Sequence, residues 1–122
     1  MDDIFYLSTV KLDTDSVCKA FQNVDGIFVK DFRASDAVQI YTETQIINMT
    51  LMGLSEFDEA DQEFIRTHEI ASVVCISHHK IYAKETLKLM MLLLDKWGGW
   101  IGSDNEGFAP IYDKINLSSF ME

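Results

Sequence analysis

Three closely spaced segments of β-strand character constrain the fold of this chain more than any other part of its sequence. Residues 27–32, 37–42 and 45–52 are rich in β-branched and aromatic residues, and apolar and polar residues alternate along the third segment. The Ser-Asp pair at residues 35–36 can form the first connecting turn, although the second connection, at residues 43–44, lacks a turn-forming residue. Connections this short join only antiparallel neighbours, so the sequence predicts an antiparallel meander.

The rest of the chain alternates between helical and extended patterns. We expect further strands at residues 4–10, 71–77 and 100–102, and helices after Asp13 or Asp15, after Ser55, and over residues 82–97. The helix after Ser55 opens with the capping pattern Ser-x-x-Asp, and the apolar run 71–77 is typical of a central strand buried on both faces. The predicted fold is α+β, with a mixed, largely antiparallel sheet of about five to six strands and about three helices packed on it.

Length and composition predict a single domain. A chain of 122 residues, 48% of them hydrophobic, can bury one core, so we expect residues 1–122 to form one globular domain. The longest apolar run, residues 89–94, is far shorter than the roughly 20 residues that cross a bilayer, and the opening Met-Asp-Asp is unlike a secretory signal. Cys18 and Cys75 have apolar neighbours, which favours buried free thiols. These features predict a cytoplasmic protein without a metal or a cofactor.

The net charge limits the classes of partner. Twenty acidic and ten basic residues give the chain a formal charge of -10. This charge repels nucleic-acid phosphates and anionic membrane surfaces, and it accelerates the encounter with a basic protein. We therefore expect a protein partner, with no direct binding to nucleic acid or to a membrane. An excess of acidic residues also serves solubility alone, which is the second interpretation.

Five acidic residues lie within eight positions at the start of the helix expected after Ser55. They are Glu56, Asp58, Glu59, Asp61 and Glu63. The positive end of the helix dipole tolerates them there, so they can simply form a solvated helix face. Alternatively, they contact Lys and Arg side chains of a partner. Paired carboxylates for hydrolysis or for a divalent cation are a third interpretation, but no other motif fixes the geometry of such a site.

A second acidic segment adds candidate partner contacts near the end of the chain. Its members are Asp104, Glu106 and Asp113. Residues 104–107 resemble part of a calcium-binding loop, but the spacing of the Asp, Asn and Gly residues does not match the twelve-residue pattern. We therefore expect a polar turn there.

Two adjacent histidines support the alternative to a binding protein. His78 and His79 follow the expected central strand, a place where active-site side chains are often found in α/β sheets. Neighbouring residues of an extended segment point to opposite sides, so one strand cannot direct both histidines to one metal ion. The alternative is a small enzyme or ligand-binding domain with a site around His78, His79 and Glu85. The sequence contains no phosphate-binding loop, nucleophile elbow or Cys-x-x-Cys, so we expect no enzyme and no catalytic residue.

The C-terminal half also shows a resemblance to a known class of proteins. An apolar strand at residues 72–77, the histidine pair, a long helix and then Gly-Gly-Trp-Ile-Gly-Ser-Asp at residues 98–104 resemble small bacterial immunity proteins of polymorphic and contact-dependent growth inhibition toxin systems. The resemblance implies tight binding to a cognate toxin domain, often a nuclease with a basic active site. Those proteins have many unrelated folds, so no interface residue is carried over. The leading hypothesis is an immunity-type protein that neutralises a basic toxin domain, with the oligomeric state left open.

Overall fold

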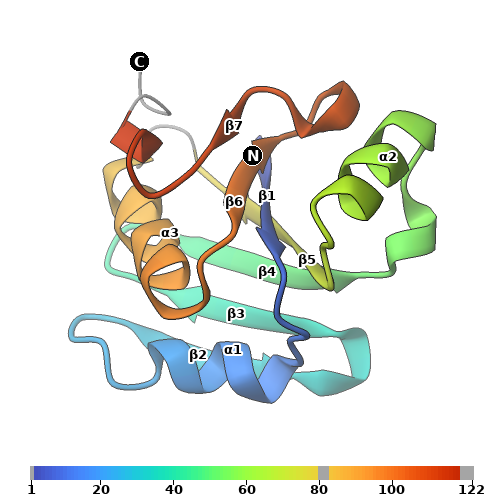
Figure 1. Cartoon of the computed structure of the whole chain (residues 1–122). Helices are drawn as coiled ribbons and strands as arrows, with labels where there is room; N and C mark the ends of the chain where they lie inside the picture. The colour runs from blue at the N-terminus through green and yellow to red at the C-terminus, as the bar shows by residue number, and fades with distance from the viewer. Residues whose placement is uncertain (1, 80–82, 119–122) are drawn as a thin grey trace.

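The computed structural model describes residues 2–79 and 83–118 and contains a seven-stranded sheet (Figure 1). In chain order its strands and α-helices are β1 (Asp2–Ser8), α1 (Thr14–Phe21), β2 (Phe28–Phe32), β3 (Ala37–Tyr41), β4 (Ile46–Met52), α2 (Glu59–Thr67), β5 (Ser72–His78), α3 (Ala83–Trp97), β6 (Trp100–Ser103) and β7 (Ile111–Tyr112). The expected α+β class is confirmed. The sheet has one strand more than expected because β7 pairs with β6, and it is not mixed, because every pairing between the described strands is antiparallel.

The predicted meander is present as β2, β3 and β4. The connection that lacked a turn residue is held by a threonine side chain. The hydroxyl of Thr42 accepts hydrogen bonds from the backbone amides of Thr44 and Gln45 at 3.2 and 3.1 Å. A Ser or Thr hydroxyl that bonds the backbone a few residues further on can replace a glycine or asparagine in a turn.

The first strand lies in the middle of the sheet, between two strands from much later in the chain. The strand order is β2-β3-β4-β5-β1-β6-β7, so β1 pairs with both β5 and β6. Phe5, for example, lies opposite Cys75 on one side and Gly102 on the other. The central position predicted for residues 71–77 is confirmed, since β5 is the fourth of seven strands and most of its side chains are buried.

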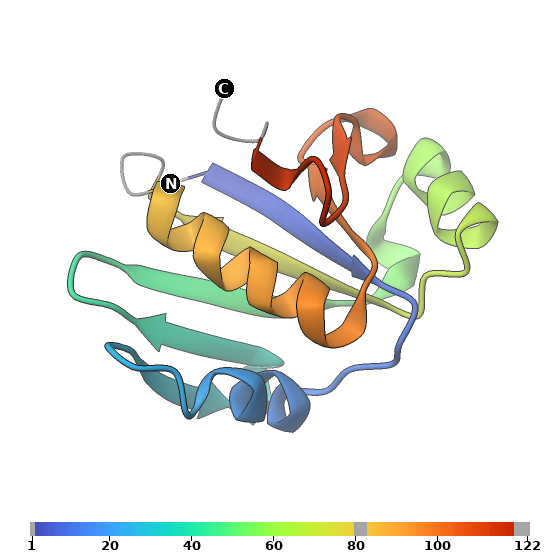
Figure 2. The ribbon, with the colours of Figure 1, turned by 60° about the vertical axis from the view of Figure 1, so that its left-hand side comes forward.

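Helices α1 and α3 cover one face of the sheet (Figure 2). Asp13 and Asp15 were the two residues expected to cap α1, and Asp13 does so. Its carboxylate accepts a hydrogen bond from the backbone amide of Ser16 at 2.8 Å. The expected start of the third helix, residue 82, lies outside the described residues. The two helices contribute Val17, Phe21, Leu89, Met90, Leu93 and Leu94 to the core, and the sheet contributes Ile4, Tyr6, Val38, Ile40, Ile47, Met49, Val74, Ile76 and Ile101.

Helix α2 and a short 3-10 turn, η4 (Glu106–Phe108), cover part of the opposite face. Phe5, Leu7 and Val73 from the sheet pack there against Ile65 and Phe108. The predicted capping residue for this helix is wrong: residues 54–56 form a separate 3-10 turn, η2, and Asp58 caps α2 by accepting from the Asp61 amide at 3.0 Å.

Tyr6 joins the sheet to the end of α3. Its fully buried hydroxyl donates to the Gly98 carbonyl at 2.7 Å and lies 3.3 Å from the Leu93 carbonyl. The Gly98 carbonyl lies just past the last residue of α3, where backbone acceptors lack partners within the helix. Burial raises the pKa of Tyr6 from 10.0 to about 12, because the phenolate has lost its hydration.

Because of Tyr6, the free energy of unfolding is expected to fall at alkaline pH. Its pKa is higher in the folded than in the unfolded protein, so its contribution is complete below pH 10 and is lost as the pH rises from 10 toward 12. We expect a loss of about 3 kcal/mol of unfolding free energy over this range. Tyr6→Phe should be about 1–2 kcal/mol less stable at neutral pH and should lose less stability in alkali than the wild type. Urea titrations at pH 7 to 11.5 test this, and parallel alkaline losses in the two proteins would contradict it.

Candidate functional site

The two acidic segments predicted as partner contacts meet at α2. The backbone amide of Gly107, in the turn after β6, donates to the Asp61 carboxylate of α2 at 2.8 Å. Phe108 of the same turn packs edge-on against Phe57 and Phe64, with ring centroids 5.4 and 5.7 Å apart. Figure 1 shows α2 beside the chain that links β6 to β7. The fold therefore places residues 56–63 next to residues 104–106.

Six exposed carboxylates surround this junction, and we call them the acidic surface. They belong to Glu56, Asp58, Glu59, Glu63, Asp104 and Glu106. Glu59 and Glu63 are four residues apart and share the outer side of α2, while Glu56 and Asp58 lie at its N-terminal end. Asp104 and Glu106 lie on the neighbouring turn.

Several of these carboxylates already have partners inside the chain. Glu56 accepts from the Gly53 amide at 2.6 Å, Asp58 caps the helix, and Glu63 pairs with Arg66 at 3.2 Å. Within residues 2–79 and 83–118, no hydrogen bond or ion pair occupies the carboxylates of Glu59, Asp104 and Glu106. These three carboxylates are therefore the ones most able to form ion pairs with Lys or Arg side chains of a partner.

Two of the predicted contact residues do not belong to the acidic surface. Asp61 faces inward to η4, and burial raises its pKa above the ordinary value, although the hydrogen bond from Gly107 lowers it. Asp113 lies in a turn beyond β7, where its carboxylate accepts from the backbone amides of Ile115 and Asn116 at 2.9 and 3.1 Å. Lys114 of that turn pairs with Asp95 of α3, so the turn lies away from α2.

His78, His79 and Glu85 lie in different surroundings. His78 is 1% exposed at the end of β5, and burial lowers its pKa. His79 is exposed, and its backbone amide donates to the Gln45 side chain at 2.9 Å. The Glu85 carboxylate accepts from the Thr44 hydroxyl at 3.0 Å, from the Gln45 side-chain amide at 3.1 Å and from the Thr42 hydroxyl. Glu85 thereby ties the β3–β4 turn to the first turn of α3.

Both cysteines, Cys18 and Cys75, are free, and burial raises the pKa of each thiol. For the half-buried Cys75 the pKa rises to about 11, so its reactive thiolate is scarce at neutral pH. In the described part of the chain, no three His, Cys, Asp or Glu residues come close enough to hold a metal ion.

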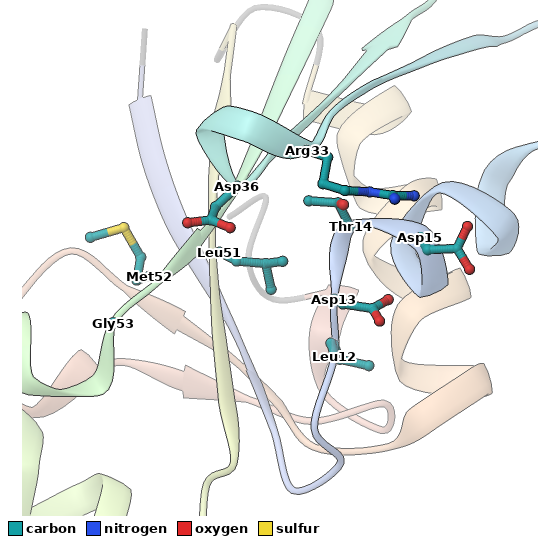
Figure 3. Close-up of a pocket in the computed structure, with 9 residues that line it drawn as sticks. All are labelled: Leu12, Asp13, Thr14, Asp15, Arg33, Asp36, Leu51, Met52 and Gly53. Atoms are coloured by element: carbon teal, nitrogen blue, oxygen red, sulfur yellow. The ribbon is translucent and has the colours of Figure 1, made fainter.

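A pocket of about 680 Å³ opens between the start of α1 and the end of β4 (Figure 3). Its charged residues are Arg33, Asp13, Asp15 and Asp36, and Figure 3 shows Arg33 extending across the pocket toward α1. Hydrogen bonds from Ser16 lower the pKa of Asp13, with a smaller contribution from Arg33. The pocket is lined by residues of three separate segments, 12–15, 33–36 and 51–53, so no local pattern in the sequence indicates it.

One part of the sheet is covered by no helix of the described residues, which the sequence did not indicate either. Phe28 and Phe32 of β2 and Ile46 of β4 are 60%, 42% and 44% exposed. They lie on the same face of the sheet as α2, whereas the alternate residues of these strands pack under α1 and α3. We call the part of this face formed by β2, β3 and β4 the open sheet face.

Comparisons with known proteins identify no relative of this chain: no family model matches it, and neither a curated protein nor a solved structure is significantly similar. Within the described residues, no helix combines the length and the apolar character needed to cross a membrane.

Proposed function

We propose that this protein binds a basic protein domain through the acidic surface, as an immunity-type protein that neutralises a cognate toxin. The observation that carries the proposal is the convergence of two acidic segments at α2. At this junction, Glu59, Asp104 and Glu106 have no internal hydrogen-bond or ion-pair partner among the described residues. The resemblance to immunity proteins and the net charge of -10 support the same class of function.

The electrostatic contribution is mainly to recognition and to the rate of association. A body of charge -10 attracts a basic domain over several ångströms, and opposed charges then align the two surfaces. A nuclease-like domain uses its cationic surface to hold phosphates. Carboxylates of Glu59, Asp104 and Glu106 on that surface would exclude the nucleic acid, and binding alone then neutralises the toxin without any catalysis by this chain.

A charge-reversal pair tests the proposal on the complex with the product of the neighbouring gene. We expect Glu59→Lys/Glu106→Lys to slow association about tenfold at low ionic strength. The control Asp25→Lys/Asp95→Lys changes the net charge equally at two exposed positions away from α2, one after α1 and one on α3, and it should slow association much less. Stopped-flow or surface-based kinetics at low and physiological salt measure both.

Three outcomes decide the question. A larger effect of the Glu59 and Glu106 pair supports the acidic surface as the contact. Equal effects of the two pairs would mean that only the total charge matters. If the wild-type chain forms no complex with the neighbouring product and does not protect cells from it, the proposed function is wrong.

A further inference from the structure

The open sheet face is arranged in rows that run across the strands. One row is apolar and joins Phe28, Tyr41 and Ile46, which are opposite one another in β2, β3 and β4. The apolar row lies at the edge farther from α2, because Phe28 begins β2 and Ile46 begins β4, whereas β4 ends in the segment that leads to α2. Exposed apolar residues grouped in this way, unlike single ones, mark interaction sites.

The next row is polar and runs across five strands. The register places Lys30 opposite Gln39, Gln39 opposite Asn48, Asn48 opposite Ser77, and Ser77 opposite Asp3. Lys30 lies over the Tyr41 ring, 5.1 Å from its centre, and the Ser77 hydroxyl donates to Asp3 at 2.6 Å. The row is therefore cationic at the β2 edge and anionic at β1.

The anionic end of this row reaches the acidic surface. Asp104 directly follows Ser103, which pairs with Ile4, so Asp104 lies next to Asp3 across the β1–β6 pair. Both carboxylates are close enough to Cys75 to add to the rise of its pKa that burial causes. The open sheet face and the acidic surface are thus continuous through Asp3 and Asp104.

The size of the open sheet face limits what can cover it. Three strands about 4.8 Å apart and five residues of about 3.4 Å each give a projected area of roughly 250 Å². Stable complexes usually take about 800 Å² from each partner, so an occupant must extend beyond this face. The adjoining area is the acidic surface, which repels a second copy of this chain and attracts a cationic protein.

We infer that the open sheet face is the second half of the binding surface, on which the basic partner seats an apolar segment against Phe28, Tyr41 and Ile46 with a Lys or Arg beside Asp3 and Asp104. This inference rests on the proposed function and adds to it the chemistry of the partner's contact region. The apolar row supplies the burial that holds the complex together, and the acidic surface supplies speed and orientation.

The test is a comparison of two double variants in the complex with the neighbouring gene product. Phe28→Thr/Ile46→Thr keeps β-forming residues at two exposed positions, so the fold should be retained, which the thermal midpoint checks. We expect the affinity to fall about 100-fold, mainly through faster dissociation, whereas Glu59→Lys/Glu106→Lys mainly slows association. Ile115→Thr, at a position 92% exposed on another part of the chain, is the control and should bind as the wild type does.

Each result separates the inference from the proposed function. Wild-type affinity in Phe28→Thr/Ile46→Thr, together with slow association in the Glu59 and Glu106 pair, would overturn the inference and leave the function standing. Absence of any complex with the wild type would overturn both. Sedimentation of the isolated wild-type chain should show a monomer; a dimer that Phe28→Thr/Ile46→Thr dissociates would assign the face to a second copy and overturn the inference.

Discussion

Substituting Gly99 by alanine is expected to remove most of the stability of this fold. Gly99 has φ +84°, and a Cβ atom there would lie 2.1 Å from the backbone carbonyl oxygen of Leu7. Leu7 cannot move away, because it is paired with Val73 on one side and Trp100 on the other. We expect a loss of about 4 kcal/mol or more, close to the whole unfolding free energy of many small domains. Urea denaturation at neutral pH measures the loss.

Gly98 provides the matched control for this substitution. It also has a positive φ, +70°, but a Cβ atom at Gly98 meets nothing within 4 Å. Gly98→Ala should therefore cost only about 1 kcal/mol, the penalty of a left-handed backbone conformation for a residue other than glycine. Similar losses in both variants would contradict the close approach of residue 99 to β1.

Phe108→Ala should be the second most damaging substitution and should act mainly on α2. The Phe108 side chain is 1% exposed and packs edge-on against Phe5, Phe57 and Phe64, with ring centroids 5.5, 5.4 and 5.7 Å apart. Its removal leaves a cavity between the sheet and α2 and is expected to cost about 3–5 kcal/mol. The amides of Glu59–Thr67 should also lose hydrogen-exchange protection more than those of α1 and α3.

Phe108→Leu keeps most of the volume and serves as the control for the cavity. It should cost roughly 1–2 kcal/mol and leave the protection of α2 nearly unchanged. Residue 108 has φ +61°, a strained conformation in both variants, so the comparison separates packing from backbone strain. Equal loss of protection in α1, α2 and α3 on Phe108→Ala would mean that α2 has no separate dependence on this side chain.

The local pattern predicted the elements well, because most of their signals lie within a few residues. The meander ends agree to within one residue at β3 and β4, where alternation and flanking turns specify the strands. The predicted start of α2 was wrong. Ser55 and Asp58 have the spacing of a capping pattern that begins at Ser55, whereas in the structure the Asp58 carboxylate itself caps the helix. The two-residue strand β7 is too short to show any periodicity.

The candidate site was less predictable because it depends on which segments meet. The acidic residues were identified in the sequence, but the proximity of residues 56–63 to residues 104–106 follows from the packing of Phe108 against α2. Room for this packing is made by Gly102, where a Cβ atom would lie 2.7 Å from the Phe108 Cβ. The exposure of Phe28 also had no local signal, since alternation in a strand does not tell which face a helix will cover.

The position of β1 separates the chain into a part that can form early and a part that forms late during synthesis. Residues 2–8 are made well before the strands on both sides of them, which are residues 72–78 and 100–103. The β2–β4 meander needs only neighbouring residues, whereas pairings between distant segments are slow to form. The loop that brings Asp104 and Glu106 to α2 follows the last of these long-range pairings. A nascent chain interrupted before residue 100 therefore has the open sheet face within its reach, but its acidic surface is incomplete because Asp104 and Glu106 are missing.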